Sequence, residues 1–246
     1  MAKTYRAMQQ WNHWLTQFLG HRLLEAEKKF LLSALVDYFG KHVLLVGVPH
    51  QHDLLKTSVI TNQILLTPLL CKDKHSKMIE GDPMELPVLS GSIDLVILPH
   101  SLEYIDNPRK LLAEACRIIK PEGHIVILGF NPFSLWGVKK MITKNQVIPW
   151  STHFIQARTV KKWLNLADFE LVKQRTFLFR PPMHHHFYHK LKLLEWFGDK
   201  CYSPFGGVYA LIAKAKVIPF TPIRMRWQQK LSSIQATLPR PSMREF

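Results

Sequence analysis

The stretch IDLVIL, residues 93–98, decides the fold together with the stretch IVIL at residues 125–128. Each is a short apolar run, the pattern of a strand that is buried on both faces of a parallel sheet. Between them, Asn107-Pro108 begins a series of apolar residues at helical spacing that Gly123 closes. A strand, a helix and a strand in this order predict a βαβ unit.

The same alternation continues outward from this unit. Helical spacing is expected at residues 15–39, 159–167 and 184–197, and strand patterns at residues 42–48, 64–66, 169–172 and 208–213. Strands that alternate with helices predict an α/β fold with an open, mostly parallel sheet and helices on both faces.

The length of 246 residues suits one α/β domain with modest extensions. We expect a helical segment at residues 1–40 that packs on the domain, the domain itself at 41–216, and a basic, irregular extension at 217–246. The three cysteines are far apart and form neither a metal-binding spacing nor a disulfide framework. We see no secretion signal, and no apolar run approaches the ~20 residues that span a bilayer, so a cytoplasmic location is expected.

The net charge of +15 is the abnormal value of the composition. From residue 214 onward, the sequence contains seven Lys or Arg and one acid. A basic surface attracts nucleic acid, acidic lipid or a small acidic substrate. No nucleic-acid-binding motif accompanies the charge, so we interpret the end of the chain as a solvated basic tail and leave a nucleic-acid partner open.

Four motifs follow one another at residues 81–127: GDPMELP from 81, SIDLVI from 92, NPRKLLAE from 107 and RIIKPEGHIVI from 117. With the segment GFNPFSLWG at 129–137, they resemble the type-11 family of class I S-adenosylmethionine-dependent methyltransferases, which includes quinone-ring methylating enzymes. The resemblance covers roughly residues 20–215. It implies a Rossmann-like sheet of seven strands, with the last strand antiparallel beside the strand that begins at Phe169, and S-adenosyl-L-methionine as cofactor.

In similar enzymes the acid of the first motif, here Asp82, accepts a hydrogen bond from the adenine amino group, and an apolar neighbour, here Met84, packs on the ring. The alternative is that Asp82 only shapes the turn. At the end of the first strand, Gly47 lets a ligand approach the backbone because it lacks a Cβ. The expected cofactor-binding residues are Gly47, Val48, Asp82, Pro83, Met84 and Pro99.

The first loop departs from the family's pattern. Residues 47–52 read GVPHQH, which lacks two glycines, and the strand before them lacks the usual acid. Pro49 fixes φ and has no N–H, so the loop cannot follow the usual path. The second strand ends in Thr67-Pro68 rather than in the acid that holds the ribose. A charged hydrogen bond contributes about 1.5–3 kcal/mol, so we expect weak cofactor affinity.

His100 stands where similar enzymes face the transferred methyl group. A histidine there can remove a proton near neutral pH, and a binding or structural role is the alternative. Asn131, Phe133 and Trp136 follow the fifth strand, where acceptor-binding loops lie in similar enzymes. They are candidates for substrate binding, and ordinary packing explains the aromatic pair equally well.

The histidines at 184–186 and 189 form no metal site in our interpretation. Only His185 and His189 share a helix face, and they lack a nearby cysteine or acid. The apolar side of residues 184–197 indicates core packing, with a lid over an acceptor or a peripheral membrane contact as alternatives.

The leading prediction is methyl transfer to a small-molecule or lipid-like acceptor by direct displacement. Two alternatives stay open. One is a methyltransferase fold that has lost catalysis and acts as a binding or regulatory protein, and the other is an RNA-directed methyltransferase.

Overall fold

The structure, a computed structural model, describes residues 2–69, 77–143, 148–182 and 205–216. Within them, seven strands form one sheet in the order β3-β2-β1-β4-β5-β7-β6. The strands are β1 (His42–Val46), β2 (Asn62–Thr67), β3 (Met78–Glu80), β4 (Ile93–Pro99), β5 (Ile119–Phe130), β6 (Phe169–Phe177) and β7 (Val208–Ala215).

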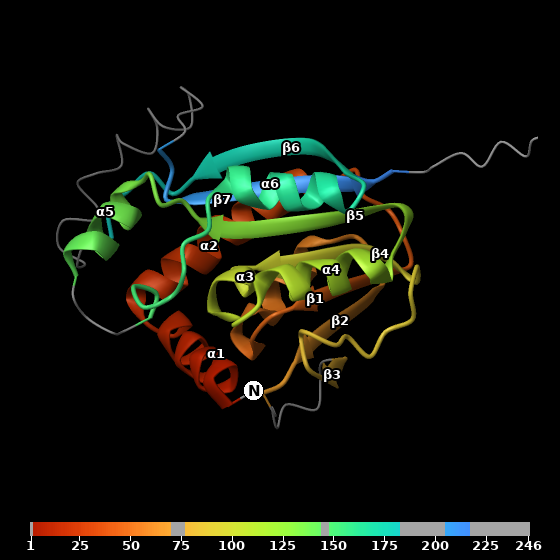
Figure 1. Cartoon of the computed structure of the whole chain (residues 1–246), viewed down its shortest axis with the longest axis horizontal. Helices are drawn as coiled ribbons and strands as arrows, with labels where there is room; N and C mark the ends of the chain where they lie inside the picture. Colours follow the sequence, from red (N-terminus) through yellow and green to blue (C-terminus); the bar gives the residue numbers. More distant parts are fainter. Residues whose placement is uncertain (1, 70–76, 144–147, 183–204, 217–246) are drawn as a thin grey trace, which may run out of the picture.

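The helices are α1 (Ala2–Leu15), α2 (Phe18–Ala34), α3 (Ser101–Tyr104), α4 (Pro108–Ile118), α5 (Leu135–Ile142) and α6 (Ala157–Leu166), with a 3₁₀ helix, η1 (Pro49–Thr57), after β1. In Figure 1, α4 and α6 lie in front of the sheet and α2 lies behind it. The Phe30 ring of α2 stacks on the Phe177 ring of β6, with the ring centroids 5.2 Å apart. This contact holds α2 against the β6 edge of the sheet.

The predicted α/β class and the seven-stranded Rossmann-like sheet are confirmed. Strands β3, β2, β1, β4 and β5 pair in parallel, so the runs at 42–48, 93–98 and 125–128 are adjacent parallel strands as expected. Strand β7 is antiparallel to both β5 and β6, as the family resemblance implied. The central strands are almost wholly buried, and their continuous apolar runs provide the two-sided core that a parallel sheet requires.

Several elements differ from the sequence-based expectation. The helix expected at residues 15–39 is α2, which spans Phe18–Ala34 and ends earlier than expected, and α1 precedes it as a separate helix that was not predicted. The short strand β3 and the helices η1, α3 and α5 were not predicted, because each is too short for its periodicity to stand out. The segment 184–197, the histidines in it and the extension 217–246 lie outside the described residues.

The order of the strands reverses between β1 and β4, because β1 leads to β2 on one side while β4 lies on the other. In open α/β sheets, ligands bind beyond the carboxyl ends of the strands at such a point. Helix α1 lies at this edge, beside α3, and the loops that follow β1, β3 and β4 open toward it (Figure 1). Within the described residues, no helix is long and apolar enough to cross a membrane.

Candidate functional site

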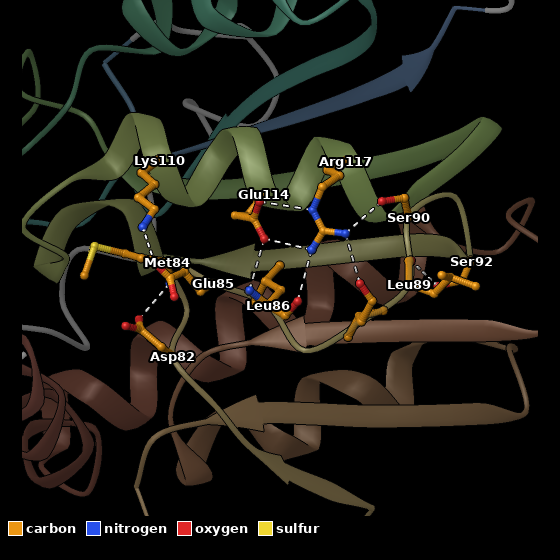
Figure 2. Close-up of polar contacts among 11 residues, drawn as sticks. Asp82, Met84, Glu85, Leu86, Leu89, Ser90, Ser92, Lys110, Glu114 and Arg117 are labelled. Atoms are coloured by element: carbon orange, nitrogen blue, oxygen red, sulfur yellow. Dashed lines mark hydrogen bonds and ion pairs between the residues drawn. The ribbon is translucent and has the colours of Figure 1, made fainter.

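The turn after β3 carries the predicted adenine-binding residues (Figure 2). One carboxylate oxygen of Asp82 accepts a hydrogen bond from the Met84 N–H at 2.8 Å, and the Asp82 carbonyl accepts from the Glu85 N–H at 3.1 Å. Asp82 therefore shapes the turn, which was the alternative interpretation of this residue. Its second carboxylate oxygen accepts no hydrogen bond from the described part of the chain, and the Met84 side chain is half-buried beside it. Shaping the turn thus leaves one oxygen to receive a ligand.

Helix α4 braces this turn from behind (Figure 2). A Glu114 oxygen accepts from the Leu86 N–H at 3.1 Å, and Arg117 donates to the Leu86 carbonyl at 3.0 Å. Arg117 also donates to the Val88 carbonyl at 3.1 Å and to Ser90 at 2.9 Å. The hydrogen bond from Arg117 holds the pKa of Glu114 below its usual value, so this pair stays charged. Sequence analysis missed the brace, although an acid and an arginine three residues apart on one helix face were the available signal.

The first loop is closed by side chains of the chain itself. The Val48 N–H donates to Oε1 of Gln51 at 3.1 Å, and Nε2 of Gln51 donates to the Pro99 carbonyl at 3.0 Å. The His50 N–H donates to Asn12 of α1 at 3.0 Å. The Gly47 and Gln51 N–H groups donate to main-chain carbonyls at 3.1 and 2.9 Å. Since proline has no N–H, every main-chain donor from residue 47 to 51 is used within the chain.

Gly47 has the close contact that was expected, but with a different partner. A Cβ at this position would lie 2.5 Å from Oε1 of Gln51. Glycine therefore makes room here for the carboxamide of Gln51, which is fully buried. Gly47, Val48 and Pro99 lie together at the switch point, and their role in cofactor binding stays a prediction. Their shared neighbour is Gln51, a residue that sequence analysis did not select.

His100 lies at the centre of a buried cluster that we call the carboxylate–histidine cluster: Glu27, His100 and Glu103. Nε2 of His100 is 2.7 Å from Oε1 of Glu27, as an ion pair without hydrogen-bond alignment, and Nδ1 is 3.0 Å from Oε2 of Glu103. The other oxygen of Glu103 accepts from the Phe130 N–H at 2.5 Å. The rings of Trp11 and Phe130 cover His100, with centroids 5.4 and 4.2 Å away. All three members of the cluster are buried.

The electrostatics of the cluster determine the charge of His100. Burial by itself lowers the pKa of His100, but the carboxylates of Glu103 and Glu27 outweigh it and raise the pKa to about 9. Burial also raises the pKa of Glu103, against the lowering effect of His100. At neutral pH His100 is thus an enclosed imidazolium without a free lone pair. This state fits the structural alternative better than the role of a base.

Glu27 was missed because it lies within the apolar stripe of α2, between Leu23 and Phe30. An acid at a core position of a helix was the signal for a buried partner, because an unpaired buried charge is very costly.

The three candidate substrate-binding residues have different contacts and different exposure. Asn131 braces its loop, with its N–H and side-chain amide donating to the carbonyls of Gly207 and Gly206 at 2.9 and 3.0 Å. Trp136 is buried against Phe130, with ring centroids 5.3 Å apart, and donates to the Arg180 carbonyl at 3.0 Å. Phe133 is 66% exposed. Of the three, only Phe133 presents its side chain at the surface.

Metal binding has no support in the part of the chain that the structure describes, where no group of three or more His, Cys, Asp or Glu side chains is arranged to hold an ion. The histidines at 184–189 lie outside that part, so their predicted lack of a metal stays a prediction.

Comparison with known proteins finds a similarity to the family that the motifs resemble. Residues 52–127 match the type-11 methyltransferase domain family. The chain is 30% identical over 140 residues to the uncharacterized protein YafS of Escherichia coli (strain K12), which covers 56% of this chain and 57% of YafS. It is 28% identical over 126 residues to the demethylmenaquinone methyltransferase of Clavibacter sepedonicus, with 43% and 51% covered. The chain thus spans about half the length of these curated relatives.

A solved structure from Thermotoga maritima, of a SAM-dependent methyltransferase and possible histamine N-methyltransferase, superposes with a TM-score of 0.64. It covers 87% of this chain and 100% of its own, at 18% identity, which shows a common fold. The family match begins at His52, directly after the loop that Gln51 closes. The turn at Asp82 lies inside the match.

Proposed function

We propose that this chain, which carries a type-11 methyltransferase domain on a class I fold, transfers a methyl group from S-adenosylmethionine to a small-molecule or lipid-like acceptor. The observation that carries the proposal is the turn at Asp82. This turn lies at the carboxyl edge of the sheet, inside the family match, with one carboxylate oxygen available and Met84 beside it. The similarity to a demethylmenaquinone methyltransferase supports an acceptor of the lipid-like class.

The residues fit the adenosine half of the cofactor better than its amino-acid half. Asp82 would accept from the adenine amino group, and Pro83 and Met84 would pack beside the ring. Gly47, Val48 and Pro99 lie where the amino-acid half would be held, and Gln51 fills the space between them. The cofactor supplies a methyl group on a positively charged sulfur. The chain contributes binding, orientation and the exclusion of water, which for a displacement of this kind are the main catalytic terms.

Calorimetric titration with S-adenosylhomocysteine tests the proposal. We expect a dissociation constant of tens to hundreds of micromolar, about −5 to −6 kcal/mol. Asp82→Asn keeps the shape of the side chain but removes its charge, so it should weaken binding by about 1–2 kcal/mol. Glu170→Gln is the control, because Glu170 is an exposed residue of β6 at the edge of the sheet.

Absence of binding at millimolar ligand would overturn the proposal in favour of a second candidate, a methyltransferase fold that binds or regulates without catalysis. The specific observation in favour of that candidate is the first loop, whose main-chain donors are all used within the chain.

A further inference from the structure

We propose that Gln51 is an internal substitute for the amino-acid group of the ligand and that it sets the ligand affinity of the site. This inference rests on the proposed function, because it assumes that S-adenosylmethionine is the ligand. It concerns one side chain that the family match does not include.

Gln51 joins two main-chain groups at the ends of two different strands. The Val48 N–H, after β1, is a donor, and the Pro99 carbonyl, at the end of β4, is an acceptor. They stand on the two sides of the switch point, where a ligand of this fold is expected. An α-amino acid group offers the matching pair, because its carboxylate accepts hydrogen bonds and its ammonium group donates them. The carboxamide of Gln51 offers the same pair, since its oxygen accepts and its nitrogen donates.

The side chain of Gln51 fills the space next to Gly47. Its Oε1 is so close to Gly47 that a Cβ there would lie only 2.5 Å away, and the side chain is fully buried. A ligand that approaches the backbone at Gly47 meets this oxygen first. The side chain of Gln51 must therefore leave before the amino-acid group can reach Val48 and Pro99.

The free energy of ligand binding depends on which hydrogen bonds are exchanged when Gln51 leaves. When Gln51 leaves, two hydrogen bonds break, and the ligand forms two of the same kind, so binding exchanges these bonds and gains little from them. Removing the carboxamide changes the starting point. The Val48 N–H then lacks its partner until the ligand arrives, and the Pro99 carbonyl keeps only the long hydrogen bond from the Ser101 hydroxyl at 3.4 Å. Unpaired buried polar groups are costly, and that cost is relieved on binding. A variant without the carboxamide should therefore bind the ligand more tightly.

The test compares three full-length variants by calorimetric titration with S-adenosylhomocysteine. Gln51→Ala should bind about tenfold more tightly than the unaltered chain. Gln51→Met removes both hydrogen bonds but keeps the volume over Gly47, so it should gain less than threefold. Gln63→Ala is the matched control. Gln63 also caps two main-chain carbonyls, those of Ser58 and Ile60 at 3.1 and 3.2 Å, but between η1 and β2. It should leave the affinity unchanged.

The outcomes separate this inference from the proposed function. If the unaltered chain binds and Gln51→Ala binds no more tightly, the inference is wrong and the proposed function stands. Binding by Gln51→Ala alone supports the inference and means that the unaltered chain is blocked by its own side chain, so the proposed methyl transfer by the unaltered chain falls. If neither chain binds, both proposals fall. A folded Gln51→Ala variant, verified by its thermal unfolding transition, is required for each comparison.

Discussion

Two stretches face the same edge of the sheet and are held in opposite ways. The turn after β3 is braced from behind by Glu114 and Arg117, so its ligand-facing side stays available. The loop after β1 is held by Gln51 and Asn12, whose side chains accept hydrogen bonds from the main-chain N–H groups that a ligand would otherwise use. A ligand adds interactions at the first stretch and must replace existing ones at the second. Loss of a contact at the braced turn should therefore weaken ligand binding. At the closed loop, loss of the Gln51 side chain should strengthen ligand binding, and loss of the buried contacts beside it should lower the stability of the fold.

The largest expected effect is on the closed side, by which we mean the loop after β1 together with the carboxylate–histidine cluster, whose His100 directly follows Pro99, the partner of Gln51. His100→Leu leaves Glu27 and Glu103 buried without their cation, which should lower the free energy of unfolding by about 3–5 kcal/mol. Urea denaturation measures this loss. His124→Leu is the control, because burial lowers the pKa of that half-buried histidine and keeps it neutral. A His100→Leu protein of unchanged stability that has lost methyl transfer would instead make His100 a catalytic residue and erase the contrast between the two sides.

The next effect is the pH dependence of stability, which also belongs to the closed side. His100 has its ordinary pKa of 6.5 when unfolded and a pKa of about 9 when folded. The stabilisation is fully present below pH 6.5 and is lost as the pH rises through 9. Its size is on the order of 3 kcal/mol. Denaturation midpoints between pH 6 and 9.5 should show the loss in the unaltered chain and not in His100→Gln. A flat profile in the unaltered chain contradicts the assigned charge.

The smallest effect is on the braced side. Arg117→Gln removes the charged donor from the carbonyls of Leu86 and Val88 and loosens the turn. The guanidinium is partly exposed, so we expect a loss of about 1 kcal/mol in the binding of S-adenosylhomocysteine, with a similar or smaller loss of stability. The control, Arg22→Gln, breaks an exposed pair with Glu25 on α2 and should alter neither. Equal effects of the two variants on binding would mean that the brace does not support the turn.

The fold was predictable because its decisive strands are continuous apolar runs, whose meaning does not depend on distant residues. The runs at 93–98 and 125–128 became adjacent parallel strands, and the family motifs placed the antiparallel last strand. The position of the Asp82 turn followed from the same motifs.

The closed side was not predictable in the same way, because its contacts join residues that are far apart in the sequence. Glu27 reaches His100 from α2, and Asn12 reaches His50 from α1. Gln51 is near Val48 in sequence, yet its second partner, Pro99, comes from another strand. No local pattern reports such a partner, so the packing of Gln51 against Gly47 could not be predicted from the sequence.

The position of α1 has a consequence for the synthesis of the chain. Trp11 packs on His100, Tyr104 and Phe130, and Thr4 donates to Asp106 at 2.8 Å, so the docking surface of the first helix is made of residues translated much later. At ribosomal speeds of about 5–20 residues per second, α1 waits on the order of 10 s before its partners exist. During that time its apolar face is exposed to chaperones and to other nascent chains. Helix α1 is thus made well before the surface on which it docks.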